Sequence, residues 1–140
     1  MSWDVLIINS PEPVDFEKGD WPEFESRELV IQKIKQSFPE SRWDDPSWGQ
    51  LDNELANIEF NVGDKDQMGN NFMLHVRGNA DPVGAITKMC SQHKWVAYDI
   101  AGEQFMDNNN PNRNGFDHWK EYRDYVLSEE SKKKAWWKFW

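Results

Sequence analysis

A chain of 140 residues is long enough to form one domain whose hydrophobic core needs neither a disulfide nor a metal. Its formal net charge of −9 argues against a nucleic-acid-binding protein, because no phosphate-neutralising surface dominates, and favours a basic protein partner. The single cysteine, Cys90, excludes an internal disulfide framework and is more typical of a small buried hydrophobe than of a nucleophile. The chain lacks a signal-peptide pattern and an apolar run of membrane-spanning length, so we expect a cytoplasmic protein without stable membrane association.

The first part of the chain predicts a strand, a long loop and a helix. Residues 3–8 contain four consecutive apolar side chains, which favour a central strand covered on both faces. Residues 9–25 are rich in proline and acidic residues and are expected to form a loop. Ser26 can cap a helix over residues 27–38, which ends before a proline. The apolar stripe of this helix consists of Ile31, Ile34 and Phe38.

Residues 42–49 predict a turn-rich connector, and a β-hairpin follows it. Segments 54–62 and 71–78 alternate apolar and polar side chains, and the residues between them are rich in glycine, asparagine and aspartate. We therefore expect two adjacent antiparallel strands with Phe60 and Leu74 buried together. The apolar face of this hairpin comprises Ile58, Phe60, Val62, Phe72, Leu74 and Val76.

The second half of the chain predicts a helix, a strand and a last helix. Asp81 and Pro82 are typical of a helix start, and the helix is expected to run to about His93 with its apolar side inward. A fourth strand is predicted over residues 95–100, and a short fifth over residues 103–106. After a polar loop, the final helix is expected to bury one face that contains Phe116, Trp119, Tyr122 and Val126.

The element order β-α-β-β-α-β favours an α+β fold with a ferredoxin-like split βαβ antiparallel sheet and an extra C-terminal helix. A single domain is expected over residues 1–131. Residues 132–140 form a separate basic, tryptophan-rich C-terminal tail, which carries four lysines, three tryptophans and no acidic residue. Docking onto the acidic body, recognition of a partner and weak contact with a membrane surface are the alternatives for this tail.

Four polar side chains are expected on one face of the hairpin: Glu59, Asn61, His75 and Arg77. A carboxylate, an imidazole and a guanidinium in one place could serve as base, acid and anion clamp, with Asn61 orienting a substrate. Asp99, on the fourth strand, is a candidate neighbour. A structural ion pair between Glu59 and Arg77 across an exposed sheet face is the competing interpretation, and such pairs are common.

Tryptophan is unusually frequent, with nine residues, and many of them fall in segments rich in proline, aspartate and glycine. Trp43 and Trp48 are the best placed of these for recognition, because large aromatic anchors in loops can form binding surfaces. They can equally pin a loop onto the core.

Motifs for bound groups are absent. The three histidines show no zinc-ligand spacing, and the loop around Asp64 does not end in the acidic residue that an EF-hand requires. No phosphate-cradling glycine pattern and no nucleophile elbow occur. We expect no cofactor and no metal. The absence of these motifs makes an enzyme less favoured than a binding protein, although an enzyme remains the alternative.

Several short motifs occur together in a fixed order: Trp43-x-Asp45-Pro46-x-Trp48-Gly49, Ile58-Glu59-Phe60-Asn61-x-Gly63 and Met73-Leu74-His75-Val76-Arg77-Gly78. This set resembles a family of small, uncharacterised bacterial proteins over roughly residues 1–127. The lysine-rich and tryptophan-rich ending is similar to that of some proteins that resemble toxin-immunity factors. The resemblance implies a bacterial origin and carries no catalytic residue.

Two functions remain open from the sequence. The preferred one is a non-catalytic binding protein of the bacterial cytoplasm, of the immunity type, that occupies a basic partner. The alternative is a small hydrolase or ligand-binding enzyme that uses the Glu59, His75 and Arg77 cluster. A deep pocket over this sheet face would favour the enzyme, and a flat acidic face bordered by tryptophan would favour the binding protein.

Overall fold

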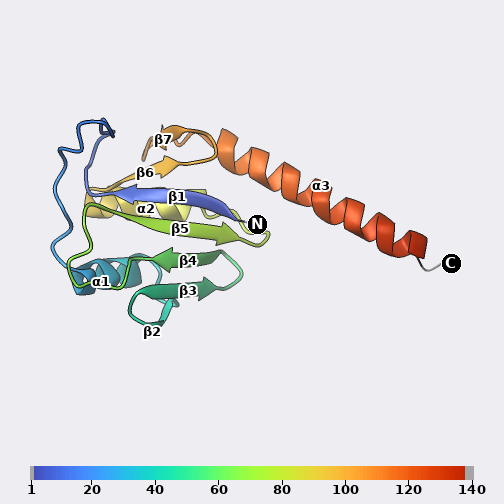
Figure 1. Cartoon of the computed structure of the whole chain (residues 1–140), viewed down its shortest axis with the longest axis horizontal. Coiled ribbons are helices and arrows are strands. Elements are labelled where there is room, and N and C mark those ends of the chain that lie inside the picture. The colour runs from blue at the N-terminus through green and yellow to red at the C-terminus, as the bar shows by residue number, and fades with distance from the viewer. Residues whose placement is uncertain (1, 138–140) are drawn as a thin grey trace.

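A computed structural model describes the backbone of residues 2–137 and the side chains of residues 2–129. The described part is an α+β structure in which an antiparallel sheet of order β2-β3-β4-β5-β1-β6-β7 is accompanied by helices (Figure 1). The elements in chain order are β1 (Trp3–Ile8), α1 (Arg27–Ser37), β2 (Arg42–Asp45), β3 (Trp48–Asp52), β4 (Asn57–Asn61), β5 (Asn71–Arg77), α2 (Val83–His93), β6 (Val96–Asp99), β7 (Gln104–Met106) and α3 (Asn114–Trp137).

The predicted hairpin is confirmed as the pair β4 and β5. Phe60 lies directly opposite Leu74 in the antiparallel register, and both side chains are fully buried in the same core. The alternation that the sequence shows therefore corresponds to one buried and one polar face of the sheet, as expected for period-two strands.

Strand β1 occupies the centre of the sheet, as its apolar run predicts. It pairs with β5 on one side and with β6 on the other, so that all its internal backbone groups have a neighbouring strand. Val5 and Ile7 face the helices and are fully buried, and Ile8 is also buried although it points to the opposite side. Burial on both faces explains why this strand lacks the polar alternation of β4 and β5.

Helices α1 and α2 lie side by side on one face of the sheet (Figure 1). The predicted cap of α1 is confirmed, because Ser26 Oγ accepts a hydrogen bond of 3.2 Å from the backbone N–H of Leu29. Helix α2 begins at Val83, whose backbone N–H donates to Asp81 Oδ1 at 3.0 Å. Cys90 of α2 is buried, and this burial raises the pKa of its thiol to about 12, as fits a small core residue.

The connector expected at residues 42–49 is instead a strand, β2, and the start of β3, which extend the sheet beyond β4. The turn between these strands is held by Asp45, whose Oδ1 accepts a hydrogen bond of 2.9 Å from the backbone N–H of Ser47. Trp43 packs on Phe60 with ring centroids 5.9 Å apart, and a Cβ atom at Gly49 would lie 2.5 Å from that indole ring. The packing of Trp43 over Gly49 thus accompanies a strand conformation in a segment whose sequence is typical of turns.

Helix α3 is longer than predicted and leaves the body of the molecule after its first turns (Figure 1). Phe116 and Trp119 are buried, but Tyr122 is 57% exposed, so the buried face ends earlier than the periodicity predicts. The backbone of the predicted tail, residues 132–140, is helical as far as Trp137. Its side chains and residues 138–140 lie outside the described residues, so their docking stays a prediction.

Candidate functional site

The polar side chains predicted to share a face do so, on the side of the sheet opposite α1 and α2. Glu59 of β4 lies directly opposite His75 of β5, and Arg77 follows two residues later on the same face. Their apolar neighbours in both strands belong to the buried core, so the pleat forces these three side chains outward.

Glu59 and Arg77 form an ion pair, with 2.6 Å between Oε1 and Nη1. This carboxylate is the main cause of the raised pKa of Arg77. The side chains of Glu59 and Arg77 are 28% and 41% exposed, so solvent screens their attraction and the pair contributes at most about 1 kcal/mol to stability. Both groups are therefore available to a partner at small cost.

His75 pairs with Asp4, which is not among the site residues predicted from the sequence. The two residues face each other in the register of β1 and β5, and His75 Nδ1 lies 2.8 Å from Asp4 Oδ1. The hydroxyl of Ser2 donates to the same carboxylate oxygen at 2.5 Å. A hydrogen on Nδ1 satisfies Asp4 and leaves Nε2 of His75 as an acceptor, which is the arrangement of an acid–base pair.

Trp48 completes this group. Its indole ring stacks on the imidazole of His75, with centroids 5.8 Å apart and planes inclined by 22°. Asn61 lies opposite Trp48 in the register, and its side-chain oxygen accepts from the backbone N–H of Gly63 at 3.3 Å. We refer to the side chains in mutual contact on this face as the open-face cluster, which consists of Asp4, Trp48, Glu59, His75 and Arg77.

Two predicted site residues lie elsewhere. Asp99 pairs in register with Val5, so its side chain points to the core on the helix side of the sheet, and it is fully buried there. Trp43 packs against Phe60 on that same side, and its ring N–H donates to Ser41 Oγ at 3.1 Å. The sheet face on which a side chain lies depends on its position within the strand and on how that strand pairs with its neighbours. The sequence alone did not give this pairing for β2 and β6.

The loop that follows β1 covers the part of the open face formed by β6 and β7. Phe16 of this loop stacks on Phe105 with centroids 5.5 Å apart and contacts the Tyr98 ring edge-to-face at 4.9 Å. Trp21 anchors the loop further along, because its ring N–H donates to the backbone oxygen of Asn70 at 2.9 Å. The open-face cluster therefore lies on the rest of this face, on β1, β3, β4 and β5.

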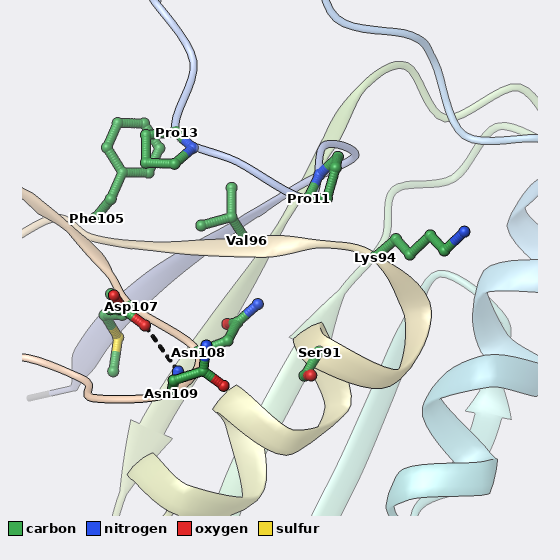
Figure 2. A pocket seen from close by; sticks show the side chains of 10 residues that line it. Pro11, Pro13, Ser91, Lys94, Val96, Phe105, Asp107, Asn108 and Asn109 are labelled. Atoms are coloured by element: carbon green, nitrogen blue, oxygen red, sulfur yellow. Dashed lines mark hydrogen bonds between the residues drawn. The ribbon is translucent and has the colours of Figure 1, made fainter.

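Five cavities in the described part of the chain lie away from the polar centre of this cluster. Figure 2 shows one of about 410 Å³, in which Val96, Phe105 and Asn108 lie beneath the proline-rich loop. A smaller hollow of about 200 Å³ borders Trp48 and is lined also by Arg42, Asp44, Asp45 and Gln50. Glu59, His75 and Arg77 line none of these five cavities.

Within the described residues, no group of three or more histidine, cysteine, aspartate and glutamate side chains is arranged to hold a metal ion. No described helix combines the length and the apolar character needed to cross a membrane. Comparisons of the chain with protein-family models, with curated proteins and with solved structures find no match.

Proposed function

We propose that this chain is a non-catalytic binding protein whose open-face cluster takes up a basic protein partner. One observation carries the proposal: charged side chains and a tryptophan lie on the part of the open face that the loop after β1 does not cover, and none of the five cavities centres on them. A flat face of this kind suits a protein surface better than a small substrate.

The charge on this face supports a basic partner. Strand β2 and its turn bring Asp44 and Asp45 to the hollow beside Trp48, and hydrogen bonds from Ser47 hold the pKa of Asp45 below its usual value. An arginine or lysine of the partner could enter this hollow against the indole face. The net charge of −9 would steer such a partner toward the protein.

The resemblance to small bacterial proteins extends the proposal to an immunity-type protein of the bacterial cytoplasm. The element order suggests the finer fold: strands β4, β5, β1 and β6 with helices α1 and α2 would form a ferredoxin-like split βαβ unit. The order of these four strands within the sheet supports that assignment. In this view, β2, β3 and β7 are additions at the two edges.

A second candidate function is a small hydrolase or ligand-binding enzyme. It is favoured by one contact, the 2.8 Å approach of His75 Nδ1 to Asp4 Oδ1, because such a pair can prepare the other ring nitrogen as a general base. Glu59 and Arg77 would then act on the substrate, with Asn61 orienting it.

Capture of a protein partner, followed by titration of that partner, distinguishes the two functions. Wild-type protein and Arg77→Ala are used to capture partners from a lysate of the source organism, and the captured protein is then purified and titrated against each. If Arg77 is a buried anchor, the substitution weakens binding by about 1 to 4 kcal/mol at an unchanged melting temperature. Lys35→Ala, at an exposed position of α1 on the opposite side of the sheet, is the matched control.

The result distinguishes three cases. Graded losses of affinity for Arg77→Ala, Glu59→Gln and His75→Ala support the binding function, whereas near-complete loss of turnover on a substrate for each single change supports catalysis. Equal capture by wild type and Arg77→Ala rules out this face as the interface. A large fall in melting temperature would assign the cluster a structural role.

A further inference from the structure

Helix α3 projects from the body of the molecule after its first turns (Figure 1). Among the side chains that the structure describes, Trp119 is the last of this helix that is buried. Residues 120–137 continue the helix for about 27 Å, at 1.5 Å per residue. A helix of this length is only marginally stable in water by itself, because most helical stability in proteins comes from the packing of one face. The projecting part of α3 is therefore a candidate surface for a partner.

One stripe of this helix is aromatic. His118, Tyr122 and Tyr125 follow one another at intervals of four and three residues, the spacing that places side chains along one side of a helix. All three are exposed, Tyr122 by 57% and Tyr125 by 63%. The same intervals lead along the helical backbone to Lys132 and Trp136. The projecting helix thus has the seven-residue repeat that is typical of helices that pair with another helix.

The charges of α3 are divided between its two ends. Residues 117–130 contain five acidic and two basic residues, whereas residues 131–140 contain four lysines and no acidic residue. One of the two basic residues, Arg123, is engaged within its own helix, since it lies over the ring of Trp119 at 5.0 Å and pairs with Asp124 at 2.9 Å. Two copies of this helix would repel each other in a parallel pair and attract each other in an antiparallel pair, because only the antiparallel pair sets unlike charges side by side.

We propose that α3 binds the α3 of a second copy of this chain in antiparallel orientation. A two-fold axis at the level of residue 127 brings Tyr122 of one copy beside Lys132 of the other, and His118 beside Trp136. An ammonium group is attracted to the face of a tyrosine ring, and an indole ring stacks on an imidazole. The aromatic stripe and the division of charge therefore favour the same arrangement of the two helices.

The base of α3 offers a place for the end of the partner helix. A cavity of about 450 Å³ lies between the first turns of α3 and the turn after β6, and Ala101, His118 and Tyr122 are among the residues that line it. In the antiparallel pair, residue 136 of the second copy arrives beside His118 and so at this cavity. The C-terminal segment 132–140 supplies three tryptophans and a phenylalanine there, and aromatic residues are enriched at protein interfaces. Each copy thus offers both the helix and the surface that receives its end.

This pairing does not depend on the proposed function, because α3 shares no residue with the open-face cluster. Arg77→Ala should therefore dimerise as the wild type does. Two single helices form a small interface, so we expect a dissociation constant of about 10 to 100 µM. At about 1 µM the chain is then monomeric, and dimerisation adds almost nothing to its thermal stability.

Sedimentation equilibrium of the full chain between about 1 µM and 1 mM tests the pairing, with a change from monomer to dimer as the expected result. Tyr125→Glu adds a negative charge to the stripe at an exposed position and should weaken dimerisation at least about tenfold. Leu127→Glu is the matched control, because Leu127 is 52% exposed and lies about 200° around the helix from Tyr125. This control should dimerise as the wild type does. A wild-type monomer at 1 mM, or equal effects of the two substitutions, overturns the proposal.

Disulfide cross-linking tests the orientation of the two helices. A mixture of Tyr122→Cys and Lys132→Cys should give a cross-linked dimer on oxidation, whereas each variant alone should give much less. The native Cys90 is buried, and burial raises the pKa of its thiol to about 12, so it takes no part in the reaction. Efficient cross-linking of Tyr122→Cys with itself would indicate a parallel pair and would overturn the proposal, as would a dimer of equal strength in a chain that ends at residue 131.

Discussion

The ring N–H of Trp3 donates a hydrogen bond of 3.0 Å to Oδ1 of Asp99, across two neighbouring strands and inside the core. The same indole contacts the ring of Phe116 edge-to-face, with centroids 5.1 Å apart. The start of β1, the end of β6 and the start of α3 are therefore joined at one point, which gives the buried carboxylate a structural role.

Trp3→Phe tests this junction. The substitution keeps a large ring and removes one donor from a buried charged acceptor, so the free energy of unfolding should fall by about 1.5 to 3 kcal/mol, with any loss of packing added. Urea unfolding followed by circular dichroism measures the change. Trp48→Phe, at a half-buried position on the open face, is the matched control and should cost less; equal losses for both would contradict the importance of the hydrogen bond.

Two glycines in the helices should respond in opposite directions to alanine. Gly115→Ala would place a methyl group onto the carboxylate of Asp99, so the start of α3 must move and stability should fall by more than about 1 kcal/mol. Gly84→Ala, in α2, meets no atom within 4 Å and should raise stability by up to about 1 kcal/mol through helix propensity. Denaturant unfolding of both variants is the measurement, and a neutral or stabilising Gly115→Ala would show that the contact is not constraining.

His93 should make stability fall as the solution is acidified. Burial is the main cause that lowers its pKa below the usual 6.5, and its ring packs on Trp95 with centroids 5.0 Å apart. Below pH 6.5 the unfolded chain therefore binds more protons than the folded protein. The stability that neutral His93 contributes is fully present above pH 6.5, and it is lost as the pH falls from 6.5 through the lower pKa of the folded protein.

His93→Gln should therefore reduce the difference in stability between about pH 7.5 and pH 5.5. Urea unfolding at the two pH values, on wild type and variant, measures it. His118→Gln, at an exposed position of α3, should leave the difference in place. A pH dependence that is the same in wild type and His93→Gln would assign it to other groups.

Removal of residues 132–140 should change the melting temperature by less than about 2 °C, because the backbone of α3 leaves the body well before this segment (Figure 1). Differential scanning calorimetry of the two proteins is the measurement. A fall of several degrees would instead favour docking of the tail on the body. Liposome binding that requires the segment would favour membrane contact.

Much of the fold was predictable because its signals are local. The alternation around Phe60 and Leu74, the apolar run of β1 and the cap at Ser26 each describe a few neighbouring residues, and each prediction is confirmed. Strands β2 and β3 escaped prediction because residues 42–49 favour turns, whereas in the folded protein Trp43 packs over Gly49 and against Phe60 of the core. That contact joins residues whose proximity no local pattern reveals.

The polar face was predictable in part for the same reason. Glu59, His75 and Arg77 belong to one hairpin, so period-two spacing was sufficient to place them together. Asp4 joins them through the register of β1 with β5, and Asp99 points away through the register of β1 with β6. The register between strands that are far apart in the sequence depends on how the whole sheet assembles, and it cannot be predicted from a single sequence.

The central position of β1 also has a consequence for biosynthesis. Trp3 pairs with Val76, and Val5 pairs with Asp99, so both neighbours of this strand leave the ribosome long after it does. At 5 to 20 residues per second, which is the usual rate of translation, an apolar strand would wait several seconds without its partners. The apolar side chains of this strand therefore stay without their sheet neighbours during that interval, and β1 is paired on both sides only after β6 has been made.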